Sequence, residues 1–259
     1  MDLGLNGRVF LITGGSRGLG LAAAEALVAE GAKVLLVARD EATLGRATAS
    51  LGGHDHAVGI ACDLADPATA ERIVAATIGR FGRLDGCLLS TGGPPVGTVM
   101  STTDDDWRGA FENVVLGSLR VARAATAAVT DSPKRLGTGA SVLFVLSTSV
   151  FSPIPGLSIS NALRPGLAMV VKDLADELGP RGIRVNGVAP GRFATDRVFA
   201  LDARSGSPDS VRRRNEAAIP LGRYGEPEEF GRLAALLLSP ACSYVNGTVV
   251  VTDGGALRC

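Results

Sequence analysis

The chain reads Thr13-Gly-Gly-Ser-Arg-Gly-Leu-Gly20 between an apolar run at residues 9–12 and an alanine-rich stretch at residues 21–29. The apolar run predicts a strand and the alanine-rich stretch predicts a helix, so the glycines fall in the turn between them. At such a turn, backbone N–H groups and the positive end of the helix face a phosphate, and a Cβ at the glycine positions would block its approach. We therefore predict that this turn binds a dinucleotide, through Gly14, Ser16, Arg17, Gly18, Leu19 and Gly20.

The bulk composition is that of one ordinary α/β domain. The chain has 259 residues, of which 46% are hydrophobic and 20% are charged, enough for a large core. The 26 basic and 26 acidic side chains balance, so no general attraction to nucleic acid or to an anionic membrane is predicted. The N-terminal segment has no basic flank, and no apolar run approaches the roughly 18 residues of a membrane span. We expect a cytoplasmic location.

Cysteine and histidine spacing gives no sign of a metal site. The four cysteines form no CxxC pair, and His54 and His56 fall in a polar loop without a third ligand nearby. We expect no metal, and reduced thiols at Cys62, Cys87, Cys242 and Cys259.

Strands and helices alternate along the chain. Short apolar runs predict strands at residues 9–12, 33–37, 58–61, 84–89, 142–146 and 183–189. Helices are predicted at residues 21–29, 41–50, 67–81, 105–129 and 162–178. This rhythm predicts a single-domain, Rossmann-like, doubly wound parallel sheet over residues 1–259, with helices on both faces and ligands at the carboxyl ends of the strands.

Residues 191–220 break this rhythm, and we predict that they form a substrate lid. The segment contains Arg212, Arg213 and Arg214. This arginine run is interpreted as a solvated helix face, with contact to an anionic substrate handle as the alternative.

Several spaced segments together resemble the short-chain dehydrogenase/reductase family, and within it the 3-oxoacyl-acyl-carrier-protein reductases. Beyond the glycine turn, the matching segments are Cys62-Asp-Leu64, Ser90-Thr-Gly-Gly93, Asn113, Arg184-Val-Asn-Gly-Val-Ala-Pro-Gly191, Pro220-Leu-Gly-Arg-Tyr-Gly-Glu-Pro-Glu228 and Val245-Asn-Gly-Thr-Val-Val-Val-Thr-Asp-Gly-Gly255. The resemblance implies hydride transfer between a nicotinamide cofactor and a carbonyl or acyl-thioester substrate. It also implies a homodimer or homotetramer that pairs through the helices at residues 105–129 and 162–178.

The resemblance further implies which residues border the cofactor. Asp63 and Leu64 match positions that contact the adenine. Ser90 and Gly92 stand where the family's Asn-Asn-Ala-Gly segment passes the adenosine ribose and the pyrophosphate, although the two asparagines are missing here. The residues that match the segment beside the nicotinamide are Pro190, Gly191, Phe193 and Thr195.

Charge after the second predicted strand favours NADP(H) over NAD(H). The strand is followed by Arg39 and Asp40, without the acid directly after the strand that would accept the ribose hydroxyls of NAD. Arg39 and Arg17 suit a 2′-phosphate, which arginine binds with a planar fork of donors. The alternative is that Arg39 is a surface residue beside Asp40.

The catalytic positions depart from the family pattern of a serine, a tyrosine thirteen residues later and a lysine four residues beyond. Ser160 and Arg164 fall on the tyrosine and lysine positions, and neither Tyr224 nor Tyr244 has a lysine four residues after it. An aliphatic hydroxyl is a far weaker acid than a phenol, and arginine keeps its charge but does not give up a proton. A proton relay through a lysine at this position is therefore lost. Arg164 could still hold ribose hydroxyls of the cofactor.

Two matching residues remain to orient a carbonyl. Asn113 matches the family's helix asparagine, and Ser147 matches its serine, with Ser149 as a close competitor and a plain strand-end turn as the alternative. We predict an NADP(H)-dependent oxidoreductase whose proton donor is a water held by Ser160 and Arg164, or the Ser147 hydroxyl. The alternative is an NADP(H)-binding sensor or partner subunit that has lost turnover.

Overall fold

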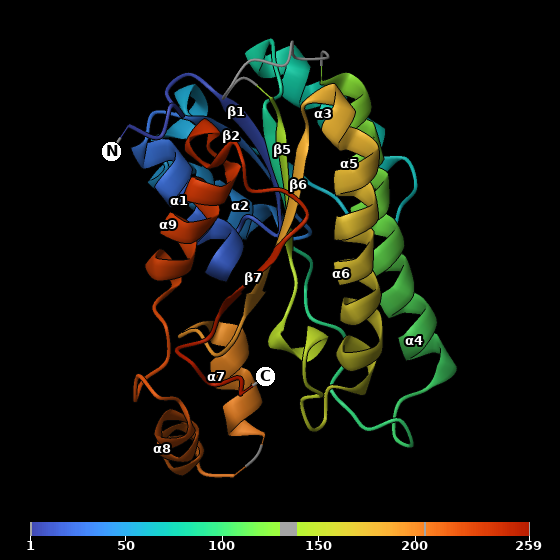
Figure 1. Ribbon diagram of the computed structural model, residues 1–259, viewed down its shortest axis with the longest axis vertical. Helices are drawn as coiled ribbons and strands as arrows, with labels where there is room; N and C mark the ends of the chain where they lie inside the picture. Colours follow the sequence, from blue (N-terminus) through green and yellow to red (C-terminus); the bar gives the residue numbers. More distant parts are fainter. Residues whose placement is uncertain (1, 130–138, 205, 259) are drawn as a thin grey trace.

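The computed structural model describes residues 2–129, 139–204 and 206–258. Within these ranges one sheet of seven parallel strands has the order β3-β2-β1-β4-β5-β6-β7 (Figure 1). The strands are β1 Val9–Thr13, β2 Lys33–Ala38, β3 Ala57–Ala61, β4 Gly86–Leu89, β5 Ser141–Val145, β6 Arg184–Pro190 and β7 Val249–Thr252. The order reverses between β1 and β4, and the carboxyl ends of such strands border the crevice in which doubly wound folds bind ligands.

Helices cover both faces of the sheet, which confirms the predicted Rossmann-like fold. In Figure 1, α1, α2 and α9 lie on one side of the sheet and α3, α5 and α6 on the other. The helices are α1 Gly18–Ala29, α2 Glu41–Ser50, α3 Thr69–Phe81, α4 Asp104–Ala110, α5 Ser118–Ala128, α6 Ser158–Leu178, α7 Asp196–Ala203, α8 Pro208–Ala218 and α9 Pro227–Leu238. Shorter helical pieces are η1 Gly53–Asp55, η2 Phe111–Gly117, η3 Thr148–Val150, η4 Gly179–Arg181 and η5 Pro240–Cys242.

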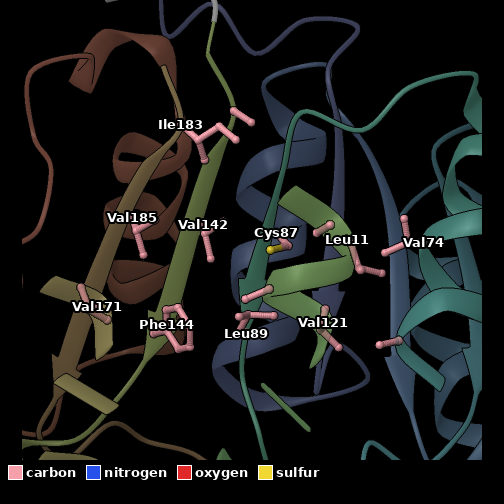
Figure 2. Packing of buried hydrophobic residues seen from close by; sticks show 14 of the residues in the cluster. Leu11, Val74, Cys87, Leu89, Val121, Val142, Phe144, Val171, Ile183 and Val185 are labelled. Carbon is pink, nitrogen blue, oxygen red and sulfur yellow. The ribbon is translucent and has the colours of Figure 1, made fainter. Parts of the chain in front are cut away.

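Two apolar cores form because successive residues of a strand point to opposite faces of the sheet. Leu11 and Val142 belong to the core beneath α3, α5 and α6, together with Val171 of α6 (Figure 2). Their neighbours Phe10 and Leu143 belong to the core beneath α1, α2 and α9. Burial on both faces explains why these strands are continuous apolar runs.

Several element bounds differ from the predicted ones. The helix predicted at residues 105–129 is interrupted by η2, which is a π-helix, and the helix predicted from residue 162 begins at Ser158. Residues 191–220 contain α7 and α8, which lie beyond the carboxyl end of β6 (Figure 1). Residue 205 of this segment lies outside the described ranges, and the role of the segment as a lid stays a prediction.

The described residues hold no group of three or more histidine, cysteine or acidic side chains placed to bind a metal ion. Cys62, Cys87 and Cys242 are free thiols, and Cys259 lies outside the described ranges. Burial raises the pKa of Cys87 to about 12, so this thiol is a packing residue of the core. In the same ranges no helix is both long and apolar enough to cross a bilayer.

Candidate active site

The glycine turn connects β1 to α1 in the geometry that a phosphate needs. Gly14 and Gly18 have φ angles of 61° and 56°, the left-handed region that favours glycine. A Cβ on Gly20 would overlap the carbonyl oxygen of Gly14. Arg17, the N-cap residue of α1, makes no side-chain capping bond, so the first N–H groups of the helix have no side-chain partner there. These residues fit the pyrophosphate of a dinucleotide.

Two arginines lie near the end of β2. Arg17 and Arg39 are both exposed, while the carboxylate of Asp40 caps α2 by accepting a hydrogen bond from the Thr43 N–H at 2.7 Å. The hydrogen bonds from Thr43 lower the pKa of Asp40, and the charges of Arg46 and Arg17 add to this effect. The Asp40 carboxylate is thus committed to the helix cap, and the exposed positive charge suits a 2′-phosphate.

The loop after β4 packs directly against the glycine turn. The Thr13 hydroxyl donates to the carbonyl of Ser90 at 2.8 Å, and the Ser90 N–H donates back to that hydroxyl at 2.9 Å. A Cβ on Gly14 would lie 2.7 Å from the Ser90 carbonyl oxygen. The carboxyl ends of β1 and β4 are therefore joined at the switch point, with Gly92 two residues further on.

The segment after β3 brings Asp63 and Leu64 to the same edge of the sheet. The Asp63 carboxylate accepts from the Ala65 N–H at 3.0 Å, and its carbonyl accepts from the Thr69 hydroxyl at 2.8 Å. Leu64 packs against Gly117 of η2, where a Cβ would come within 2.8 Å of the Leu64 carbonyl oxygen. The turn that contains Asp63 and Leu64 is thus held by Thr69 of α3 and packed against Gly117 of η2.

Two serine hydroxyls meet between η3 and α6. Ser149 and Ser160 are 3% and 7% exposed, and their Oγ atoms are 3.4 Å apart. Ser147 instead caps η3, since its Oγ accepts from the Ser149 N–H at 3.1 Å. The structure therefore brings Ser149, and not Ser147, to Ser160.

Arg164 lies one helical turn beyond Ser160 and is buried, with 6% of its surface exposed. Its guanidinium donates to the carbonyl of Val145 and to the Thr91 hydroxyl at 3.4 Å. Burial and the charge of Arg197 lower the pKa of Arg164 to about 10, so the side chain remains charged at neutral pH. Arg164 thereby bridges the ends of β4 and β5.

Asn113 lies on η2, the π-helical segment between α4 and α5. The amide is half-buried, and η2 packs against α6, the helix that carries Ser160. Short π-helical segments occur frequently at functional sites. Asn113 is thus placed on the neighbour of the serine-bearing helix, and its match to the family asparagine stays a prediction.

The segment after β6 closes the site on its other side. The Gly191 N–H donates to Thr252 of β7 at 2.9 Å. Phe193 is buried in edge-to-face contact with Phe230, with ring centroids 5.9 Å apart, so its side chain belongs to the core. Thr195 caps α7 and faces Gly18, where a Cβ would lie 3.7 Å from the Thr195 methyl group.

Arg197, which the sequence pattern did not single out, contacts the loop after β4. Its guanidinium lies against Gly93, where a Cβ would overlap it, and it donates to the Pro94 carbonyl at 3.3 Å. A positive charge two residues after Thr195, in a segment matched to the nicotinamide side, is the signal that could have found it.

A Rossmann-like nucleotide-binding protein is the class that this fold and glycine turn define. A family model described as Enoyl-(Acyl carrier protein) reductase matches residues 14–256. The 3-oxoacyl-acyl-carrier-protein reductase of Vibrio cholerae is 31% identical over 253 residues, which cover 98% of this chain and 98% of that protein.

Solved structures agree with this match over the whole chain. L-sorbose reductase from Gluconobacter frateurii, complexed with NADPH and L-sorbose, has a TM-score of 0.90 and 29% identity, covering 100% of both chains. A short-chain oxidoreductase from Pseudomonas aeruginosa PAO1, described as containing an atypical catalytic center, has a TM-score of 0.87 and 27% identity, covering 97% of this chain and 98% of its own. The chain belongs to the short-chain dehydrogenase/reductase family of oxidoreductases.

Proposed function

We propose that the protein is an NADP(H)-dependent oxidoreductase that interconverts a carbonyl and an alcohol with a proton donor other than tyrosine. The observation that carries this proposal is the placement of the glycine turn and of the Ser149, Ser160 and Arg164 group. The turn follows β1, Ser149 follows β5, and Ser160 and Arg164 lie on the first turns of α6, from which Arg164 reaches Thr91 after β4. A dinucleotide whose pyrophosphate binds at the glycine turn would then extend toward the Ser149 and Ser160 hydroxyls and the positive charge of Arg164.

Each part of the cofactor has residues suited to hold it. The glycine turn would take the pyrophosphate, Asp63 and Leu64 the adenine, and Arg17 with Arg39 the 2′-phosphate. The backbone of residues 190–195 would border the nicotinamide. NADPH is the cofactor that L-sorbose reductase holds in its crystal structure, which supports the same choice here.

When bound, the cofactor supplies a hydride acceptor or donor. The Ser149 and Ser160 hydroxyls, 3.4 Å apart, can both donate to a carbonyl oxygen placed beside the pair, at hydrogen-bond distance from each, once neither donates to the other. Their contact favours Ser149 over Ser147 as the positioning serine. Arg164 stabilises negative charge on that oxygen but keeps its own proton. The proton then comes from a water held by Ser160 and Arg164, or from a serine hydroxyl. A poor general acid costs on the order of 10²–10⁴ in rate, so we expect slow turnover or an activated substrate.

The test is a titration of the purified protein with NADPH and with NADH by calorimetry, followed by NADPH oxidation with ketones, quinones and acyl thioesters. We expect NADPH to bind more tightly than NADH, and at least one carbonyl to consume NADPH. A protein that binds neither nucleotide contradicts the proposal at its first step.

A second candidate function is an NADP(H)-binding sensor or partner subunit without turnover. The favouring observation is that Arg164 donates inward to Val145 and Thr91, while no phenol or ammonium stands at the family's catalytic positions. Tight NADPH binding without oxidation by any carbonyl, together with reductase activity gained by Ser160→Tyr plus Arg164→Lys, favours this candidate. An adapted enzyme predicts turnover in the wild-type protein and loss of it in the double variant.

A further inference from the structure

Arg197 places a guanidinium in the loop region after β4. The residue is at the start of α7, two residues after the N-cap Thr195, and its side chain remains accessible to solvent. The guanidinium lies against Gly93, which has no side chain to push it away, and one N–H group donates to the Pro94 carbonyl at 3.3 Å. Within the described part of the chain no other acceptor bonds this guanidinium, so its remaining N–H donors are left for a ligand.

A line of positive charge runs through this region. The charge of Arg197 helps to lower the pKa of Arg164 after the larger effect of burial. In the same way, burial and then the charge of Arg204 lower the pKa of Arg197. Arg197 is therefore repelled by the like charges of Arg164 on α6 and of Arg204 at the end of α7, and a bound anion would relieve this repulsion.

No acidic side chain among residues 2–129, 139–204 and 206–258 forms an ion pair with Arg164 or Arg197. Other arginines nearby are neutralised. Arg192 pairs with Asp202 at 2.8 Å, Arg212 with Glu216 at 2.8 Å, and Arg223 with Glu229 at 2.7 Å. The carboxylates that form these three ion pairs, on α7, α8 and α9, therefore do not neutralise Arg164 or Arg197.

The helix that carries Arg197 is held in place by a buried acid. Asp202 is 3% exposed and accepts from Tyr224 Oη at 2.8 Å, Arg192 Nη1 at 2.8 Å and Asn215 Nδ2 at 3.2 Å. These bonds tie α7 to α8 and to the segments on either side. The fold therefore fixes the position of α7, from which the Arg197 side chain reaches the Pro94 carbonyl.

We propose that the substrate carries a carboxylate or phosphate group beside its reactive carbonyl, and that Arg197 binds this anion with Arg164 behind it. This inference rests on the proposed function, because it takes Ser160 as the place of the carbonyl. The phosphates of the cofactor have their own donors in the glycine turn and in Arg17 with Arg39. Arg197 instead contacts the loop after β4 at Gly93 and Pro94, the same loop that Arg164 contacts at Thr91. A guanidinium matches carboxylate and phosphate with two parallel hydrogen bonds.

Calorimetric titration of the NADPH complex tests the inference with two pairs of probes, acetoacetate against methyl acetoacetate and dihydroxyacetone phosphate against dihydroxyacetone. We expect at least one anion to bind about tenfold or more tightly than its neutral counterpart. Which pair shows the difference distinguishes a carboxylate from a phosphate. We expect Arg197→Met to abolish the tighter binding of the anion relative to its neutral counterpart. Arg197→Lys should keep part of this difference because the positive charge remains. Arg123→Met, which removes the same charge from the exposed face of α5, leaves the advantage intact.

Three results would overturn the inference. In the first, neither anion binds better than its neutral counterpart. In the second, Arg123→Met weakens anion binding as much as Arg197→Met, which indicates a general charge effect. In the third, Arg197→Met weakens NADPH itself and leaves the preference for the anion unchanged, so that Arg197 is a cofactor contact. Failure of the proposed function is visible separately as absent NADPH binding in the wild-type protein, and repeating the titrations without NADPH still measures the anion site.

Discussion

Gly20 determines how closely α1 approaches the glycine turn. A Cβ at this position would overlap backbone atoms of Gly14, which cannot move aside as a flexible side chain would. We expect Gly20→Ala to displace the N–H groups of the turn and to weaken NADPH binding by about tenfold or more, or ~1.4 kcal/mol. Calorimetric titration with NADPH measures the change.

The matched control is Gly45→Ala in the middle of α2. No atom lies within 4 Å of a Cβ at Gly45, and alanine favours a helix interior over glycine by roughly 1 kcal/mol. This variant should melt at a slightly higher temperature and bind NADPH normally. If Gly20→Ala binds NADPH with the same affinity as the wild-type protein, the glycine turn is not the phosphate-binding site.

The serines show where prediction from residue spacing ends. A count of thirteen residues back from Ser160 selects Ser147, yet the hydroxyl that meets Ser160 belongs to Ser149. The reason is local, because Ser147 accepts a hydrogen bond from the Ser149 N–H and thereby starts η3. Spacing gives the position of a residue along the chain, but the turn decides which side chain points inward. The functional choice between the two serines stays a prediction.

Among the elements, the strands β1 to β6 were predicted, whereas β7 and α9 were not, and α6 was predicted to begin four residues too late. Strands buried on both faces are apolar throughout and end at glycine or polar residues, so their pattern is local. The apolar pattern of α6 is clear only from residue 162, whereas the helix begins at Ser158 and includes Pro165. Its first turn depends on Asn161, which bonds a loop that the helical pattern does not reveal.

Asn161 fastens the first turn of α6 to the loop before it. The side chain accepts from the Ile154 N–H at 3.0 Å and donates to the Ile154 carbonyl at 2.9 Å. We expect Asn161→Ala to lower the free energy of unfolding by about 1–3 kcal/mol, as for a lost pair of partly buried hydrogen bonds. Because Ser160 and Arg164 share this helix start, kcat/KM should fall more than NADPH affinity does.

Thermal melting and steady-state kinetics check this prediction, with Ser158→Ala as the control. Ser158 is half-buried at the same helix start, but its side chain makes no hydrogen bond within the described part of the chain. The Ser158→Ala variant should therefore have the same melting temperature and the same kcat/KM as the wild-type protein. Equal effects of the two substitutions would show that the Asn161 bonds do not position the helix.

At the scale of the whole molecule, the candidate site consists of the segments that follow six strands, β1 to β6, together with η2 and the first turns of α6. The sequence predicted that these carboxyl ends share one edge, because alternating strands and helices produce a parallel sheet. It did not predict that Arg197 would meet the Pro94 carbonyl, 103 residues away in sequence. Such a contact depends on the path of α7, which no short pattern specifies.

The surface of the two helices expected to pair in an assembly is partly apolar. Phe111 of η2 is 45% exposed and Met169 of α6 is 65% exposed. Ala122 and Ala125 of α5 are 2% exposed and belong to the chain's own core, so they do not serve an interface. The exposed large apolar side chains of Phe111 and Met169 are therefore the observation that supports the predicted homodimer or homotetramer.

Met169→Glu tests that assembly. A carboxylate buried in a helix contact without a partner costs several kcal/mol, so we expect the wild-type protein to sediment as a dimer or tetramer of 26.4 kDa chains and the variant to dissociate toward monomer. Met100→Glu is the control, because Met100 is 94% exposed in the loop before α4. A monomeric wild-type protein contradicts the predicted assembly. If the wild-type protein is oligomeric and Met169→Glu sediments in the same way, Met169 does not lie in the contact between subunits. A buried unpaired carboxylate in that contact would have caused dissociation.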